Sequence, residues 1–152
     1  SKYHKENPYK FAFEGGTLQV DYTPAESTGS MFGGNSNWRG PIWFPMNYLI
    51  LDSLSKFSDY YGSDYEVEFP TNSGEMMNIK DAAEGVSRRL LAMFVPNEKG
   101  VIPMYDGHEK LHEDSHLFFE YFDGDTGKGL GANHQTGWTG LISEIILQLH
   151  KK

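Results

Sequence analysis

A helical stretch decides the fold of this chain: PIWFPMNYLILDSLSKFSDYYG at residues 41–62. Proline is tolerated in the first turn of a helix, so the helix is expected to begin between Pro41 and Pro45. The apolar residues that follow recur at intervals of three and four, which is the period of one helix face. They are Met46, Leu49, Ile50, Leu54, Phe57 and Tyr61. Gly62 can cap the end, and the stretch therefore predicts an amphipathic helix.

Two further helices are predicted downstream. Asn78 can cap the first, with Asp81 three residues later in place of the usual Glu, and Pro96 and Gly100 stop it. Its apolar stripe consists of Ile79, Ala82, Ala83, Val86, Leu90 and Phe94. The last helix is expected over residues 138–150. One face of it carries Leu141, Ile145 and Leu149. Three helices predict a mainly α chain.

The remaining segments predict turns and a short hairpin. Residues 11–22 place alternating apolar residues around Gly15 and Gly16, as in a β-hairpin. Residues 23–41 are rich in Gly, Ser, Asn and Pro and predict a long irregular loop. Such a loop inside a compact domain is often functional. Residues 63–77 are also predicted to be a loop.

The composition excludes several classes of protein. Of 152 residues, 38% are hydrophobic and 22% are charged, which fits neither a disordered nor a membrane protein. A formal net charge of −8 without a Lys/Arg cluster argues against nucleic acid and anionic membranes as partners. The absence of cysteine excludes disulfides and thiolate metal sites. Residues 1–10 show no signal peptide. The compartment stays open, with the cytoplasm favoured.

Glu120 is the first candidate for chemistry. It interrupts the apolar run LFFEYF at residues 117–122, whose periodicity fits a strand or a helix, and residues 123–137 then contain five glycines. A carboxylate among aromatic rings is costly to bury, and acid–base catalysis uses such surroundings. Glycines allow the backbone to approach a ligand closely. The alternative is a glutamate on the exposed face of a half-buried segment.

Two other segments have the composition of sugar subsites. Residues 35–43, NSNWRGPIW, place two tryptophans, an arginine and small amides just before a helix. Indole rings can cover the apolar face of a sugar while arginine and amides bind its hydroxyls. Residues 134–140, HQTGWTG, lie at a helix N-terminus, where Thr136 or Thr139 is alternatively a cap. A structural elbow with buried tryptophans is the alternative for residues 35–43.

Two long blocks of the sequence resemble the C-terminal segments of glycoside hydrolase family 63. They are GGNSNWRGPIWFPMNYL at residues 33–49 and FFEYFDGDTGKGLGANHQTGWTGLI at residues 118–142, and the resemblance extends to DYTPAEST at residues 21–28. The family contains processing α-glucosidases and bacterial relatives that act on small α-glucosides or α-mannosides. The resemblance implies a mainly α chain that forms part of an (α/α)6 toroid, with a small β-hairpin near the N-terminus. Residues 1–152 would be a single segment, the C-terminal portion of the catalytic domain.

The same resemblance implies an inverting glycoside hydrolase that acts on α-linked glucosides or mannosides without a metal or a cofactor. Glu120 corresponds to the catalytic base of the family. The residues expected to line the sugar pocket are Trp38, Arg39, Gly40, Trp43, His134, Gln135 and Trp138. The expected partners are a carbohydrate substrate and either the rest of the barrel or other copies of the chain.

One departure from the family is the missing catalytic acid. An inverting glycosidase pairs an acid, which protonates the leaving oxygen, with a carboxylate base about 6.5–9.5 Å away. The acid of the family is an Asp in an upstream segment that has no counterpart here, so the isolated chain is expected to be inactive. The internal substitutes to consider are Asp21, Glu26, Asp123 and Asp125. An incomplete barrel would also expose apolar helix faces, which favours association.

Two other functions stay open. The missing acid is compatible with a non-catalytic carbohydrate-binding or scaffold remnant. Residues 108–112, HEKLH, match H-E-x-x-H, in which His108 and His112 could bind zinc from one helix face while the Glu acts as a base. The preceding Gly107 and the lack of an apolar helical stripe disfavour this zinc hydrolase.

Overall fold

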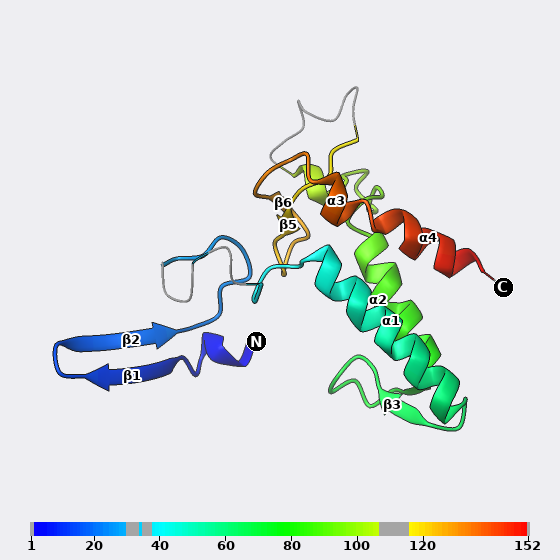
Figure 1. Cartoon of the computed structure of the whole chain (residues 1–152), viewed down its shortest axis with the longest axis horizontal. Coiled ribbons are helices and arrows are strands. Elements are labelled where there is room, and N and C mark those ends of the chain that lie inside the picture. Colours follow the sequence, from blue (N-terminus) through cyan, green and yellow to red (C-terminus); the bar gives the residue numbers. More distant parts are fainter. Residues whose placement is uncertain (1, 30–33, 35–37, 107–115, 152) are drawn as a thin grey trace.

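Three helices form the body of the chain in a computed structural model, which describes residues 2–29, 34, 38–106 and 116–151. They are α1 (Phe44–Tyr61), α2 (Ile79–Leu91) and α4 (Ile142–His150). Helices α1 and α2 run side by side in opposite directions, and α4 packs on α2 (Figure 1). Short helical turns are α3 (Thr136–Thr139), η1 (Lys2–Lys5) and η3 (Pro103–Tyr105). The three predicted helices are therefore confirmed.

Two-stranded antiparallel ribbons accompany the helices. β1 (Tyr9–Phe13) pairs with β2 (Gly16–Val20), which confirms the predicted hairpin. β3 (Glu66–Glu68) pairs with β4 (Met76–Asn78), so the prediction of a plain loop over residues 63–77 was wrong. Strands of three residues are too short to show the alternation that identifies a strand in a sequence. β5 (Tyr121–Phe122) pairs with β6 (Gly129–Leu130), so the ambiguous apolar run ends in a strand.

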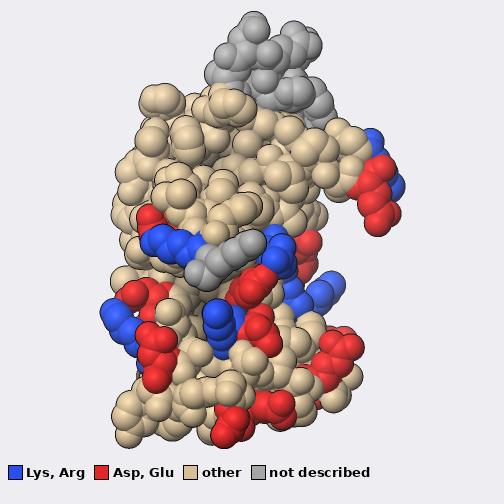
Figure 2. Space-filling model, turned by 90° about the vertical axis from the view of Figure 1, so that its right-hand side faces the viewer, with Lys and Arg blue, Asp and Glu red and all other residues tan. Residues whose placement is uncertain are grey.

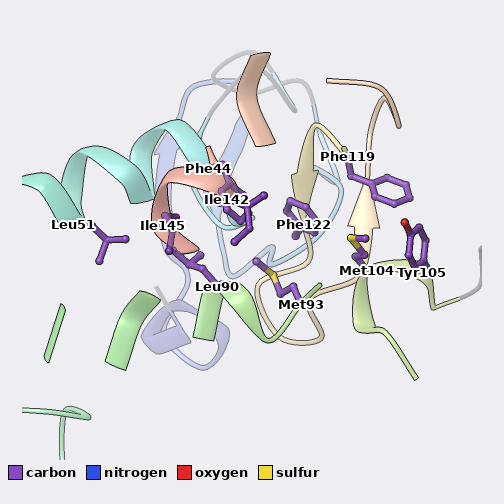
Figure 3. Packing of buried hydrophobic residues seen from close by; sticks show 10 residues of the cluster. All are labelled: Phe44, Leu51, Leu90, Met93, Met104, Tyr105, Phe119, Phe122, Ile142 and Ile145. Atoms are coloured by element: carbon purple, nitrogen blue, oxygen red, sulfur yellow. The ribbon is translucent and has the colours of Figure 1, made fainter. Parts of the chain in front are cut away.

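The hydrophobic core joins all three helices to β5. Its buried members are Phe44, Leu51, Leu90, Met93, Met104, Tyr105, Phe119, Phe122, Ile142 and Ile145 (Figure 3). Phe44, Phe122 and Ile145 have no exposed surface at all. Removal of such large apolar side chains from water is the main force that stabilises a fold. The start of α1, the strand β5 and the start of α4 are thus held at one place.

Helix α1 buries a different face from the one predicted. Phe44 and Leu51 are buried and Tyr48 packs against the core. The predicted face is instead 40–57% exposed at five of its residues: Met46, Leu49, Ile50, Phe57 and Tyr61. Helix α1 is apolar on two sides, and the other described helices cover only one of them. A helix that is apolar on several sides is typical of one enclosed between layers.

Helix α2 begins and packs as predicted. The Asn78 side chain accepts a hydrogen bond from the Asp81 amide at 2.9 Å and donates one to the Asp81 carboxylate at 2.8 Å. Ile79, Ala82 and Leu90 are buried on its inner face. The helix ends at Leu91, several residues before Pro96, because the chain turns there and carries Met93 into the core.

The predicted last helix is divided into α3 and α4. Neither Thr136 nor Thr139 caps it, so that hypothesis was wrong: the residue before α3 is Gln135, which makes no capping bond through its side chain. Thr139 is fully buried instead, and its hydroxyl donates a hydrogen bond to the Phe119 carbonyl. This bond fastens α3 to the segment that leads into β5.

The hairpin β1–β2 projects away from the helices (Figure 1). The segment that follows it is tied to the body, since the Tyr22 hydroxyl donates to Asp125 Oδ1 at 2.7 Å. The Nζ atom of Lys2 lies 3.7 Å from the same carboxylate oxygen of Asp125. Asp125 belongs to the turn between β5 and β6, so this contact connects the N-terminal part of the chain to the glycine-rich region.

Acidic and basic side chains are interspersed over one part of the face shown in Figure 2, and the rest of that face is largely uncharged. Among the residues with described positions, no helix combines the length and the hydropathy needed to cross a membrane.

Thr139→Val should destabilise the chain, because valine keeps the shape of threonine but cannot bond to the Phe119 carbonyl. We expect the free energy of unfolding to fall by about 1–3 kcal/mol, which is typical of a lost buried hydrogen bond. Thr136→Val is the matched control, since Thr136 is exposed in the same helical turn. Denaturant unfolding followed by circular dichroism measures both variants, and equal losses would contradict the assignment.

The Tyr22–Asp125 contact should make stability depend on alkaline pH. The hydrogen bond to Asp125, together with partial burial and nearby negative charge, raises the pKa of Tyr22 from 10.0 to about 12. The folded chain therefore favours the protonated phenol, so this contribution is complete below about pH 10 and is lost as the pH rises through about 12. Asp125→Asn should return the pKa of Tyr22 toward its ordinary value. Ultraviolet titration of tyrosinate, with Tyr22→Phe as the reference, measures this change.

Candidate active site around Glu120

Two main-chain contacts hold Glu120 beside the segment after β6. Its amide donates to the Ala132 carbonyl at 2.7 Å, and the Ala132 amide donates to Glu120 Oε2 at 3.1 Å. The residue is half-buried, between the fully enclosed Phe119 and Tyr121. The carboxylate is thus attached to the backbone while part of it stays accessible, which suits a group that must reach a water.

Four aromatic rings from distant parts of the sequence meet next to Glu120. Trp43 is stacked between Trp38, at a centroid distance of 5.1 Å, and Tyr121, at 4.6 Å. Trp138 meets the Trp38 ring edge-on at 4.9 Å. Trp43 is 3% exposed, whereas Trp38 is 39% exposed. The structure therefore brings together the three predicted tryptophans, with Trp38 as the outer ring and Trp43 as the inner one.

The segment that carries Trp38 and Trp43 is bonded directly to β5. Ile42 and Phe122 exchange backbone hydrogen bonds of 2.8 and 3.0 Å. Gly40 has a φ of +90°, and a Cβ there would lie 2.1 Å from the Thr23 carbonyl oxygen. Only glycine permits this approach, so Gly40 allows the Trp38 segment to pack against Thr23, in addition to any contact with a sugar.

The other predicted pocket residues flank the Glu120 segment. His134 forms a bridge with Phe118 and is exposed, and the Gln135 amide donates to the Phe118 carbonyl at 2.7 Å. Arg39 is exposed next to Trp38. All three thus lie on segments that contact either the aromatic stack or the strand of Glu120.

The carboxylates considered as internal acids all have structural partners. Tyr121 donates to Glu26 Oε2 at 2.8 Å, and Asp125 accepts from Tyr22. Asp123 Oδ1 accepts from the amides of Asp125 and Thr126. Asp21 accepts from the Gln19 side chain at 3.2 Å. These bonds give each of the four groups a role in local structure.

The described residues contain no group of three His, Cys, Asp or Glu side chains placed to hold a metal ion. His108 and His112, the residues of the alternative zinc site, lie outside the described residues. His116 is described and exposed.

Sequence reasoning missed the residues that hold Glu120 in place. Tyr121 links the aromatic stack to Glu26, and Ala132 bonds to the carboxylate. The spacing of glycines at 129 and 131 was the available signal, because alternate small residues indicate close packing against a neighbouring strand. A hollow of about 320 Å³ lies elsewhere, between α1, α2 and α4, and includes none of the predicted site residues.

Comparisons with known proteins bear on the family of this chain. Residues 29–148 match the model of the glycosyl hydrolase family 63 C-terminal domain. The uncharacterized protein YMR196W of Saccharomyces cerevisiae is 49% identical over 96% of the chain. The mannosyl-oligosaccharide glucosidase of the same yeast is 30% identical over 76%, and alpha-glucosidase 2 of Arabidopsis thaliana is 32% identical over 72%.

The chain spans only 14% of the length of the first of these relatives and 11% of the other two. No solved structure matches it. The family match nevertheless covers most of the chain, including the Trp38–Trp43 segment, Glu120 and Trp138. The chain therefore belongs to glycosyl hydrolase family 63, as part of its C-terminal domain.

Proposed function

We propose that this chain supplies the general base of an inverting glycoside hydrolase that acts on α-linked glucosides or mannosides. The observation that carries the proposal is the position of Glu120, whose carboxylate is anchored to Ala132 beside the stack of Tyr121, Trp43 and Trp38. Within the two sugar classes, the names of the glucosidase relatives favour glucosides.

The chemical step assigns one task to this chain. Glu120 takes a proton from a water molecule, the water oxygen bonds to the anomeric carbon, and the bond from that carbon to the leaving oxygen breaks. A second carboxyl group, about 6.5–9.5 Å from the base, must protonate the leaving oxygen. The internal carboxylates hold structural bonds, so we place this acid outside the chain.

The aromatic stack supplies a surface for the sugar. Trp38 presents part of its ring to solvent, and Trp43 supports that ring from behind. Trp138 closes one edge. Arg39, His134 and Gln135, on the flanking segments, would bind hydroxyl groups of the sugar, while Gly40 allows the Trp38 segment to pack against Thr23.

The chain would form part of an (α/α)6 toroid, as the C-terminal portion of the catalytic domain. Two observations support this: the open apolar face of α1, and relatives that are several times longer than the chain. Helices of the remaining barrel, or of another copy, would cover that face and complete the walls of the pocket.

A non-catalytic carbohydrate-binding or scaffold role is the second candidate. The observation in its favour is that the four internal carboxylates considered as the acid are all hydrogen-bonded within the chain: Asp21, Glu26, Asp123 and Asp125. A chain with a base and a sugar surface but no acid would bind without turnover.

Glu120→Gln is the direct test of the catalytic proposal. The isolated chain should bind glucose or mannose without hydrolysing aryl α-glycosides. A chimera in which it replaces the matching segment of the yeast mannosyl-oligosaccharide glucosidase should hydrolyse them. Glu120→Gln should then lower kcat by about 100- to 10,000-fold, the usual contribution of a general base. Exposed Glu98→Gln is the control, and equal activity of the two variants would contradict the proposal.

The open face of α1 should make the isolated chain associate. Exposed apolar patches of this kind drive oligomerisation, so light scattering should find species larger than a monomer. The substitutions Leu49→Lys and Ile50→Lys should reduce their size, whereas Ser55→Lys, on the same helix but off this face, should not. A monodisperse, stable monomer of the unaltered chain would contradict the barrel assignment.

A further inference from the structure

Gly131 lies directly against the carboxylate of Glu120. Its φ is +69°, and a Cβ at this position would lie 2.7 Å from Glu120 Oε2 and 2.6 Å from Cε1 of the Tyr121 ring. Both distances are well inside van der Waals contact. A side chain at position 131 would therefore displace either the carboxylate or the ring.

The Tyr121 side chain is held both by its ring and by its hydroxyl group. Its face stacks on Trp43 at 4.6 Å, and its hydroxyl donates to Glu26 at 2.8 Å. Tyr121 is also 3% exposed, so it has little room to move. The Glu120 side chain is half-exposed, and its carboxylate is held by the hydrogen bond from the Ala132 amide rather than by enclosing rings, so an added methyl group at Gly131 would move the carboxylate first.

Glu120 and Ala132 are bonded twice. The backbone of Glu120 donates to Ala132, and Ala132 donates back to Oε2 of the Glu120 side chain. This pair of bonds fixes both the strand register and the direction of the carboxylate. Within the described part of the chain, no hydrogen bond to Oε1 accompanies the bond to Oε2.

We infer that Gly131 and the Ala132 amide form a positioning device for Glu120, in which Oε2 is the anchored oxygen and Oε1 the oxygen that takes the proton from water. This inference rests on the proposed function for the role of Oε1, but the anchoring itself does not. Gly131 is a positioning residue: it touches no substrate and acts by leaving space for the carboxylate. A displacement of about 1 Å at a reacting group can cost about 100-fold in rate.

Nuclear magnetic resonance of the 152-residue chain tests the anchoring without any need for turnover. The Ala132 amide resonance should shift with pH because its hydrogen-bond partner is a carboxylate oxygen, and Glu120→Gln should abolish this dependence. Glu98→Gln should leave it unchanged. An Ala132 amide that does not respond to pH, or that responds equally in Glu120→Gln, would overturn the inference.

Gly131→Ala tests the requirement for space. It should abolish the pH response of the Ala132 amide and, in the chimera, lower kcat by about 100-fold with little change in KM. Gly100→Ala is the matched control, because Gly100 has a similar φ of +75° but a Cβ added there would have no atom within 4 Å. It therefore carries the same backbone strain without the contact.

The outcomes separate the two proposals. If both glycine variants lose stability equally and Gly131→Ala keeps the amide response, the positioning role is wrong. If the anchoring is found but Glu120→Gln keeps full turnover in the chimera, the proposed function is wrong and the anchoring stands. If Gly131→Ala does not fold, the response of the unaltered chain and of Glu120→Gln still decides the anchoring.

Discussion

The burial of Phe122 is the constraint on which the rest of this structure depends. Its ring has no exposed surface, and the centroid of the ring lies 5.5 Å from that of Phe44 and 5.7 Å from that of Phe94. Its backbone exchanges two hydrogen bonds with Ile42. The side chain thus joins the core of the helices, while the main chain joins the segment that enters α1. Burial of this one aromatic residue therefore fixes β5 relative to the core of the helices and to the segment that enters α1.

This constraint also determines where Glu120 lies. Phe119 and Phe122 both enter the core, so the residues between them are placed at its edge. Tyr121 is used by the aromatic stack, and Glu120 remains at the boundary between the core and the solvent. The surrounding packing is costly to rearrange because interiors are filled at crystal-like density. The packing of the core therefore determines the position of the Glu120 carboxylate.

The helical body has an incomplete layer. One face of α1 contacts the core through Phe44 and Leu51, and the opposite face presents Leu49, Ile50 and Phe57 to solvent. The chain belongs to family 63, and its relatives are much longer than the chain. Parts of the protein that the chain lacks would therefore explain why one face of α1 is uncovered. The exposed face is where further helices of the proposed toroid would pack.

Sequence alone determined the three helical regions, the family, and a hairpin around Gly15 and Gly16, which was predicted at residues 11–22 and lies at residues 9–20. Helix caps such as Asn78 and apolar periodicity are local properties, which the order of residues records directly. The blocks that contain Trp38, Glu120 and Trp138 were sufficient to identify family 63.

Only the tertiary structure decided which face of α1 is buried, that Thr139 bonds to the Phe119 carbonyl, and that Ala132 holds the Glu120 carboxylate. These features depend on contacts between segments that are distant in the chain or that run in opposite directions across a turn. A sequence shows which residues can be buried, but the partner that buries them is chosen by the packing of the whole molecule.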